Sequence, residues 1–259
     1  KHCGKMTRAA AIFVLALSPV CSALAAQTQG AAFFKAVRDP VKISRNSEPL
    51  KIARNSTIPA KGLKISVPAG ELLGVAFSNG VSAVAVGPAE FSVDALTQDA
   101  PPSVCAPGGR ESHPSKMAVS VLSGKLVFSA SDRLERSEFS IKLPAGAVAE
   151  ARARAVIAEV APEGARLAPV GGTARIKAGG EIWDVVKDEN FAYVAVSASG
   201  KAAKPVFERV YSSERRRFSE LIKSAEILRG STFFKLGKDG KFSAETVMPK
   251  TFFSMPTRR

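Results

Sequence analysis

The chain has 259 residues, of which 46% are hydrophobic and 23% charged, a composition that excludes wholesale disorder. Its formal net charge is +14, which favours acidic partners such as lipid headgroups, acidic polysaccharide or nucleic acid. A basic surface that serves solubility alone explains the same charge. Aromatic residues make up only 7% of the chain, so we expect a core built mainly from valine, alanine, leucine and isoleucine.

The first residues have the three parts of a secretory signal peptide. Lys5 and Arg8 precede an apolar run over residues 9–17, and small residues in an Ala-x-Ala pattern follow at residues 22–26. The apolar run is shorter than the roughly 20 residues that a membrane span needs. We therefore predict a bacterial Sec-type signal peptide over residues 1–26 and a periplasmic or secreted mature protein. Membrane association is expected only if the signal peptide is not cleaved.

The cysteine count changes when the signal peptide is removed. Cys3 and Cys21 lie inside it, which leaves Cys105 alone and without an internal disulfide partner. Cys105 and His113, the one histidine of the mature chain, both fall in a long Pro- and Gly-rich stretch over residues 98–115. This stretch predicts a surface loop, and we expect no metal site and no cofactor.

Residues 27–40 predict a loose entry segment, and residues 41–200 predict an all-β domain. The most informative stretch, residues 72–94, predicts three short strands joined by turns at Ser78-Asn79-Gly80 and at Gly87-Pro88, because Asn-Gly between apolar runs is a strong hairpin signal. Short alternating runs predict further strands at residues 41–44, 50–53, 63–67, 117–122, 125–131, 138–143, 147–151, 155–161, 165–168, 173–177, 181–186 and 191–196. Turn residues separate them, notably Ser123-Gly124 and Gly171-Gly172. Short strands at this spacing predict an antiparallel β-sandwich or roll.

The chain changes character at Lys201, and residues 201–259 predict a basic extension. Apolar residues at helical spacing predict an amphipathic helix over residues 205–229, with Gly230 as its C-cap. A small hairpin is predicted over residues 232–247, and the basic end of the chain follows it. We expect the apolar stripe of the helix to pack on the sheet.

The strand and turn pattern resembles a known family. The motifs that carry the resemblance are FSNGV at residues 77–81, VGPAEF at 86–91, LSGKL at 122–126, FSIKLPAG at 139–146, VGGTA at 170–174 and KAGGE at 177–181. Over residues 42–196 the chain is similar to the FecR-like domain of bacterial exported proteins. One departure is Arg152-Ala153-Arg154-Ala155, which stands where the family has a Gly-Thr pair. The resemblance implies no catalytic residues, and with only eight residues before the apolar run it implies the extracytoplasmic module alone.

These features predict a non-enzymatic periplasmic or cell-envelope binding or scaffold module whose partner is an envelope protein. The alternative is a basic binder of an anionic envelope polymer, such as polysaccharide, lipopolysaccharide or extracellular DNA; export argues against cytoplasmic nucleic acid. The candidate contacts for that polymer are Arg215, Arg216, Arg217, Lys223 and Arg229. A solvated helix face is the competing interpretation, because glutamates offset part of this charge.

A glycoside-hydrolysing enzyme is a third possibility that we weighed. Glu181, Asp184, Asp188 and Glu189 cluster around Trp183, and paired carboxylates are what such chemistry requires. However, the run from Glu181 predicts a strand, in which neighbouring side chains point to opposite faces. The sequence also contains none of the common hydrolase, metalloprotease or nucleotide-binding motifs. We therefore predict that the protein is not an enzyme.

Overall fold

The computed structural model describes residues 27–99, 111, 113–130, 136–179, 181–187, 190–196 and 200–247. The predicted signal peptide, Cys105 and the basic end of the chain lie outside these residues. Asp188 and Glu189 also lie outside them, as do the side chains of Glu181, Trp183 and Asp184.

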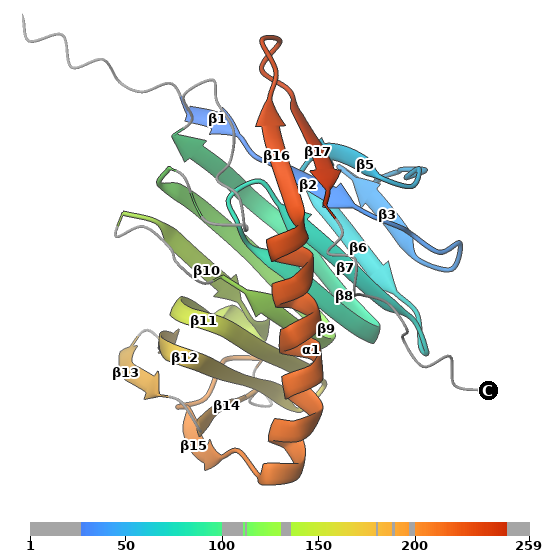
Figure 1. Cartoon of the computed structure of the whole chain (residues 1–259). Helices are drawn as coiled ribbons and strands as arrows, with labels where there is room; N and C mark the ends of the chain where they lie inside the picture. The colour runs from blue at the N-terminus through green and yellow to red at the C-terminus, as the bar shows by residue number, and fades with distance from the viewer. Residues whose placement is uncertain are drawn as a thin grey trace, which may run out of the picture.

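The fold is all-β with one C-terminal helix among the described residues, as predicted (Figure 1). The strands are β1 (Gln27–Gln29), β2 (Ala31–Phe34), β3 (Lys42–Arg45), β4 (Glu48–Pro49), β5 (Ser56–Pro59), β6 (Leu63–Val67), β7 (Leu72–Phe77), β8 (Ser82–Asp99), β9 (Ser115–Ser129), β10 (Glu138–Lys142), β11 (Val148–Ala161), β12 (Gly164–Ala178), β13 (Glu181–Lys187), β14 (Asn190–Ala195), β15 (Val206–Arg209), β16 (Thr232–Leu236) and β17 (Phe242–Thr246). A single 3₁₀ turn covers Pro144–Gly146, and helix α1 covers Ser212–Ser231. Strands β1 to β15 are joined by hydrogen bonds into one sheet system, which is antiparallel except where β9 and β10 pair in parallel.

Four long strands, β8, β9, β11 and β12, each belong to two layers. The first part of β8 pairs with β7, and its later part pairs with β6. In the same way β11 pairs with β9 at residues 155–160 and with β10 at 148–150, and β12 pairs with β14 and then with β13. We call the layer that contains β2, β7 and β14 the helix-side layer, and the layer that contains β3, β6, β10 and β13 the open layer. Apolar side chains from both layers share one buried core, as in a sandwich whose strands cross from sheet to sheet.

Three of the predicted turns are wrong, because Gly87-Pro88, Ser123-Gly124 and Gly171-Gly172 lie inside continuous strands. These glycines mark bends and close approaches of the backbone. A Cβ atom on Gly87 would lie 1.8 Å from the carbonyl oxygen of Pro68, and one on Gly124 would lie 2.2 Å from that of Pro88. The pairing of β8 with β9 shifts register at this point. Glycine and proline therefore predicted irregular backbone correctly, but the irregularity is a bulge between two layers and not a chain reversal.

The turn predicted at Ser78-Asn79-Gly80 is confirmed. The strands predicted at 63–67 and 138–143 are also confirmed, and their ends agree with β6 and β10 to within one residue. No strand forms at 50–53. The entry segment at 27–40 is not loose, because it contains β1 and β2. Strand β2 is buried along its whole length between β5 and β7.

Helix α1 starts later and ends later than predicted. The residues expected to form its first turns instead form β15, which pairs with β14, and the helix begins at Ser212. Tyr211 precedes it, and the backbone N–H of Tyr211 donates to the Glu214 carboxylate at 3.2 Å. The helix continues through Gly230 to Ser231, so Gly230 is an interior residue and not the C-cap.

Helix α1 lies across the outer face of the helix-side layer (Figure 1). Phe218, Ile222 and Ala225 are buried there against side chains of β9, β11 and β14. The hydroxyl of Ser82 also donates a hydrogen bond to the carbonyl of Ala225 at 2.6 Å. The hairpin of β16 and β17 covers the neighbouring part of the same face, where Phe234 packs against β2 and β7. The predicted packing of the apolar stripe on the sheet is therefore confirmed.

Candidate binding groove beside helix α1

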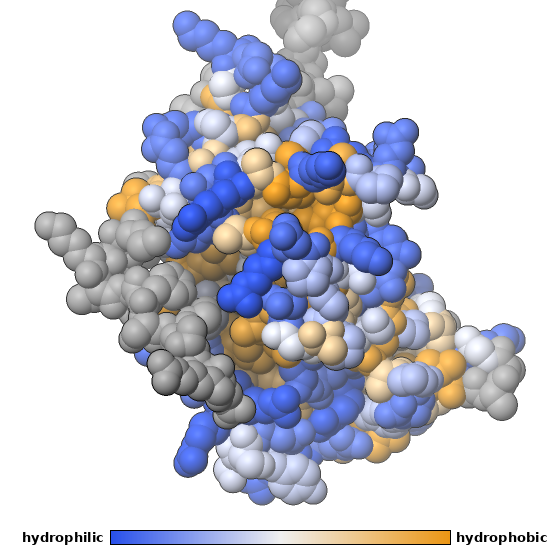
Figure 2. All heavy atoms as spheres, turned by 90° about the vertical axis from the view of Figure 1, so that its right-hand side faces the viewer, coloured by the Kyte–Doolittle hydropathy of each residue, from blue (hydrophilic) through white to orange (hydrophobic). Residues whose placement is uncertain are grey.

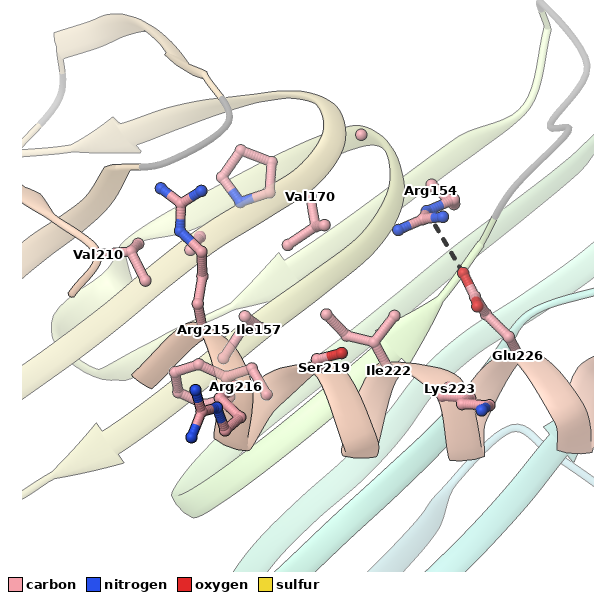
Figure 3. Close-up of a pocket in the computed structure, with 14 residues that line it drawn as sticks. Arg154, Ile157, Val170, Val210, Arg215, Arg216, Ser219, Ile222, Lys223 and Glu226 are labelled. Atoms are coloured by element: carbon pink, nitrogen blue, oxygen red, sulfur yellow. Dashed lines mark ion pairs between the residues drawn. The ribbon is translucent and has the colours of Figure 1, made fainter. Parts of the chain in front are cut away.

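A groove of about 780 Å³ runs between helix α1 and the bend in the β11–β12 hairpin (Figure 3). Its floor is apolar and includes Ile157, Val170 and Ile222. We call Arg154, Arg215, Arg216 and Lys223, which border this floor, the cationic rim. This volume lies in the range of small-ligand and peptide-anchoring pockets, and an apolar floor with few polar groups is their usual lining.

Helical spacing explains the helix side of the groove. Arg215, Ser219, Ile222 and Glu226 recur every three or four residues, so they share one side of α1. The opposite wall depends on Gly171 of β12, because a Cβ atom there would lie 3.1 Å from the Cβ of Arg154. Gly171 therefore leaves room for the Arg154 side chain at the end of the groove.

The rim is only partly neutralised by acidic residues. Arg154 Nε lies 3.3 Å from Glu226 Oε1, an ion pair between side chains that are 53% and 29% exposed. Pairs this exposed contribute little to stability. Within the described residues, Arg216 and Lys223 have no carboxylate at ion-pair distance, and both are exposed. The groove therefore presents net positive charge beside an apolar floor.

The structure separates the five predicted polymer contacts. Arg215, Arg216 and Lys223 line the groove together. Arg217 faces a second hollow, of about 470 Å³, near Gly87. Arg229 lies beyond the groove and donates from Nε to the hydroxyl of Ser129 at 3.1 Å. Sequence reasoning missed Arg154 as a groove residue, although Arg-x-Arg in a strand places both arginines on one face.

The second hollow is bordered by a set of mutually paired charges. Arg166 lies 3.2 Å from a Glu159 oxygen and 3.1 Å from a Glu214 oxygen, and Lys125 is paired with Glu159. The Arg166 guanidinium also stacks over Phe191, 4.1 Å from the ring centroid. Because Glu214 belongs to α1 and the other charges belong to the sheet, these contacts fix the start of the helix on the sheet. Apart from Arg217, the cations at this hollow are paired with carboxylates, which makes it a weaker binding candidate than the groove.

Asp94 on the open layer has an altered titration. Burial acts to raise its pKa, but hydrogen bonds from Lys142, Ser120 and Ser92, with the charge of Lys142, outweigh burial and hold the pKa below its ordinary value. The Ser120 hydroxyl lies 2.7 Å from Asp94 Oδ2, and Lys142 Nζ lies 2.8 Å from the same oxygen. Asp94 is therefore an ionised acceptor in a cross-strand network, which suits a structural role better than a general acid.

The loop end of the sandwich contains a buried polar network. Ser115 donates its hydroxyl hydrogen to Glu111, and Asn79 Nδ2 donates to the same serine oxygen at 3.1 Å. His113 lies between Glu111 and Ser115 in the sequence and is half-buried. The described residues contain no group of three or more His, Cys, Asp or Glu placed to hold a metal ion.

No protein-family model matches the chain, and no curated protein sequence matches it. Among solved structures, the chain is similar to a candidate anti-sigma factor from Parabacteroides distasonis, with 12% sequence identity and a TM-score of 0.40. The match covers 60% of this chain and 63% of the length of that one. A likeness this weak assigns neither a family nor a function. In the part of the chain that the structure describes, no helix is both long enough and apolar enough to cross a membrane.

Proposed function

We propose that the protein is a non-enzymatic, FecR-like binding module of the bacterial cell envelope, and that the groove beside α1 is its partner-binding surface. The observation that carries this proposal is the combination of an apolar floor and a cationic rim in one groove. The FecR-like assignment rests on the strand and turn motifs between residues 77 and 181, and the envelope location rests on the signal-peptide pattern.

A protein partner would use both parts of the groove. Its apolar side chains would be buried against Ile157, Val170 and Ile222, and its carboxylates would face Arg216 and Lys223. Apolar burial supplies most of the affinity in such interfaces, and the surrounding charges fix orientation and raise the association rate. Binding of this kind persists in high salt.

Photo-crosslinking tests the proposal with a matched pair of positions. Ser219 lines the groove and Ser213 does not, and both serines are exposed on α1. The full chain, carrying a photoreactive residue at one or the other, is expressed with its own signal sequence and irradiated in intact cells. We expect one envelope protein to be crosslinked from position 219 and not from 213, and its capture to survive high salt. Equal crosslinking from both positions, or none from 219, would refute the groove.

The cationic rim supports a second candidate function, the binding of an anionic envelope polymer. Arg216 and Lys223 have exposed charges with no carboxylate at ion-pair distance among the described residues, so a polymer does not have to displace an existing partner. Contacts of this kind weaken steeply with salt, which distinguishes them from capture by the apolar floor.

A further inference from the structure

The register of the β11–β12 hairpin aligns four cations in a single row. Going along the hairpin, Lys177 lies opposite Val148 and Arg175 lies opposite Glu150. Arg152 comes next, opposite Thr173, and Arg154 follows beside Gly171. One cation therefore stands at every second position along the hairpin, first from β12 and then from β11. Because a strand rises about 3.4 Å per residue, successive cations are separated by roughly 7 Å along the strand direction.

All four side chains of this cationic row point away from the core. Lys177, Arg175, Arg152 and Arg154 are exposed, whereas the alternating neighbours Ala149, Ala151 and Ala153 are buried in the shared core. The row is therefore a feature of one outer surface and not a set of charges spread around the molecule.

The lysines on β6, β9 and β10 of this face have partners. Lys64 lies 2.6 Å from Glu90, Lys116 lies 3.0 Å from Glu138, and Lys142 lies 2.8 Å from Asp94. Arg152, Arg175 and Lys177 have no such carboxylate within the described residues, although Glu150 stands opposite Arg175 in the register. Cross-strand pairing is thus the rule over β6 to β10, and the row on β11 and β12 departs from it.

The row leads into the groove at Arg154. Arg154 belongs to both, because it ends the row and also pairs with Glu226 on the groove wall (Figure 3). From Glu226 the groove follows α1 back toward Lys223, Arg216 and Arg215. Row and rim together carry seven cations, and the carboxylates Glu150 and Glu226 are interspersed among them. The surface as a whole is strongly positive.

We propose that the cationic row and the cationic rim form one track for a linear polyanion, and this inference rests on the second candidate function. The ligand is an extended chain with repeating sulfate, carboxylate or phosphate groups. It lies along the β11–β12 hairpin, turns at Arg154 and continues beside α1. An extended polymer fits because regularly repeated charges match a row of evenly spaced guanidinium and ammonium groups.

The test uses heparin and inorganic polyphosphate as probes, so that a sulfated glycan and a phosphate polymer are distinguished. The row variant is Arg152→Gln/Arg175→Gln/Lys177→Gln, and the rim variant is Arg216→Gln/Lys223→Gln. The charge-matched control for the row is Lys51→Gln/Arg54→Gln/Lys61→Gln, on exposed loops between β4 and β6. Dissociation constants are measured for the full chain over a series of salt concentrations.

We expect the row variant to weaken binding of at least one probe by tenfold or more at low salt, with the control close to the wild type. By analogy with nucleic acids, where each lost phosphate contact lowers the salt slope by roughly 0.7 to 0.9, the row variant should lower the slope by roughly 2. If the row variant matches the control while the rim variant is weakened, the row takes no part and this inference fails alone. If the wild type binds neither probe, polymer binding itself is refuted. If the control weakens as much as the row and rim variants, binding follows net charge alone and the localised track is refuted.

Figure 2 shows the surface from the right-hand side of Figure 1, where hydrophilic side chains surround a band of apolar residues. Large apolar side chains that are exposed include Leu72, Leu122 and Phe207, which belong to three different strands. None of the three lines the groove.

Discussion

Replacing Phe218 by alanine tests how firmly α1 is attached to the sheet. Phe218 is 2% exposed, and its ring meets that of Phe191 edge-to-face with the centroids 5.7 Å apart. The ammonium group of Lys125 lies 4.8 Å from the same ring centroid. Truncating a buried phenylalanine costs about 3–5 kcal/mol, a range that includes the cavity left behind. The aromatic pair contributes about 0.5–1.5 kcal/mol of such a loss.

We therefore expect Phe218→Ala to lower the free energy of unfolding by about 3–5 kcal/mol in urea denaturation followed by circular dichroism. Phe207→Ala is the control, because Phe207 is 50% exposed and should lose less than about 1 kcal/mol. If the helix detaches separately, the transition broadens and loses its two-state form. A loss below about 1 kcal/mol for Phe218→Ala, with a single sharp transition, would refute the packing of α1 on the helix-side layer.

Three further substitutions test particular features of the fold. Gly230→Ala should raise the free energy of unfolding by about 0.5–1 kcal/mol, because Gly230 is inside α1 and a Cβ added there would meet no atom within 4 Å; a loss would instead support a C-cap. Gly87→Ala should lower it by about 3 kcal/mol or prevent folding, since the new Cβ would overlap the carbonyl of Pro68; wild-type stability would contradict the close approach. The pKa of Asp94 is lower in the folded than in the unfolded protein. Its ionisation therefore stabilises the fold fully at a pH above the unfolded-state pKa, and this stabilisation is lost as the pH falls through the folded-state pKa. The free energy of unfolding of Asp94→Asn should therefore be lower than that of the wild type at pH 7, and the two values should converge in acid. A difference in free energy that does not change with pH would contradict this.

The sequence predicted the fold class and most strand positions because period-two alternation reports directly which side chains face the core. It failed where one strand crosses between layers. Gly124 has a positive φ of 83° within β9, and a pattern of glycine beside serine does not distinguish a bulge from a hairpin. Strand β15 was missed for a different reason. Its four residues are exposed and end just before the helix begins at Ser212, so their only strand signal is pairing with β14, which is a long-range contact.

The candidate site was predictable in part. The run of three arginines predicted a basic helix. Helical geometry, however, places Arg215 and Arg216 beside the groove and Arg217 beside the second hollow. Arg154 and the rest of the row join them only through the register of β11 with β12, which no local pattern specifies. The Arg152-Ala153-Arg154 alternation was visible, but its position beside the helix was not.

Adjacent arginines on α1 offer the most direct test of the groove as the binding surface. Arg216→Glu and Arg217→Glu make the same charge change at neighbouring exposed positions, and only Arg216 lines the groove. The measurement is the amount of envelope material that each purified full-length variant retains from an envelope extract at fixed salt, relative to the wild type. The account predicts a loss of at least severalfold for Arg216→Glu and a much smaller change for Arg217→Glu. Equal retention by the two variants would contradict it.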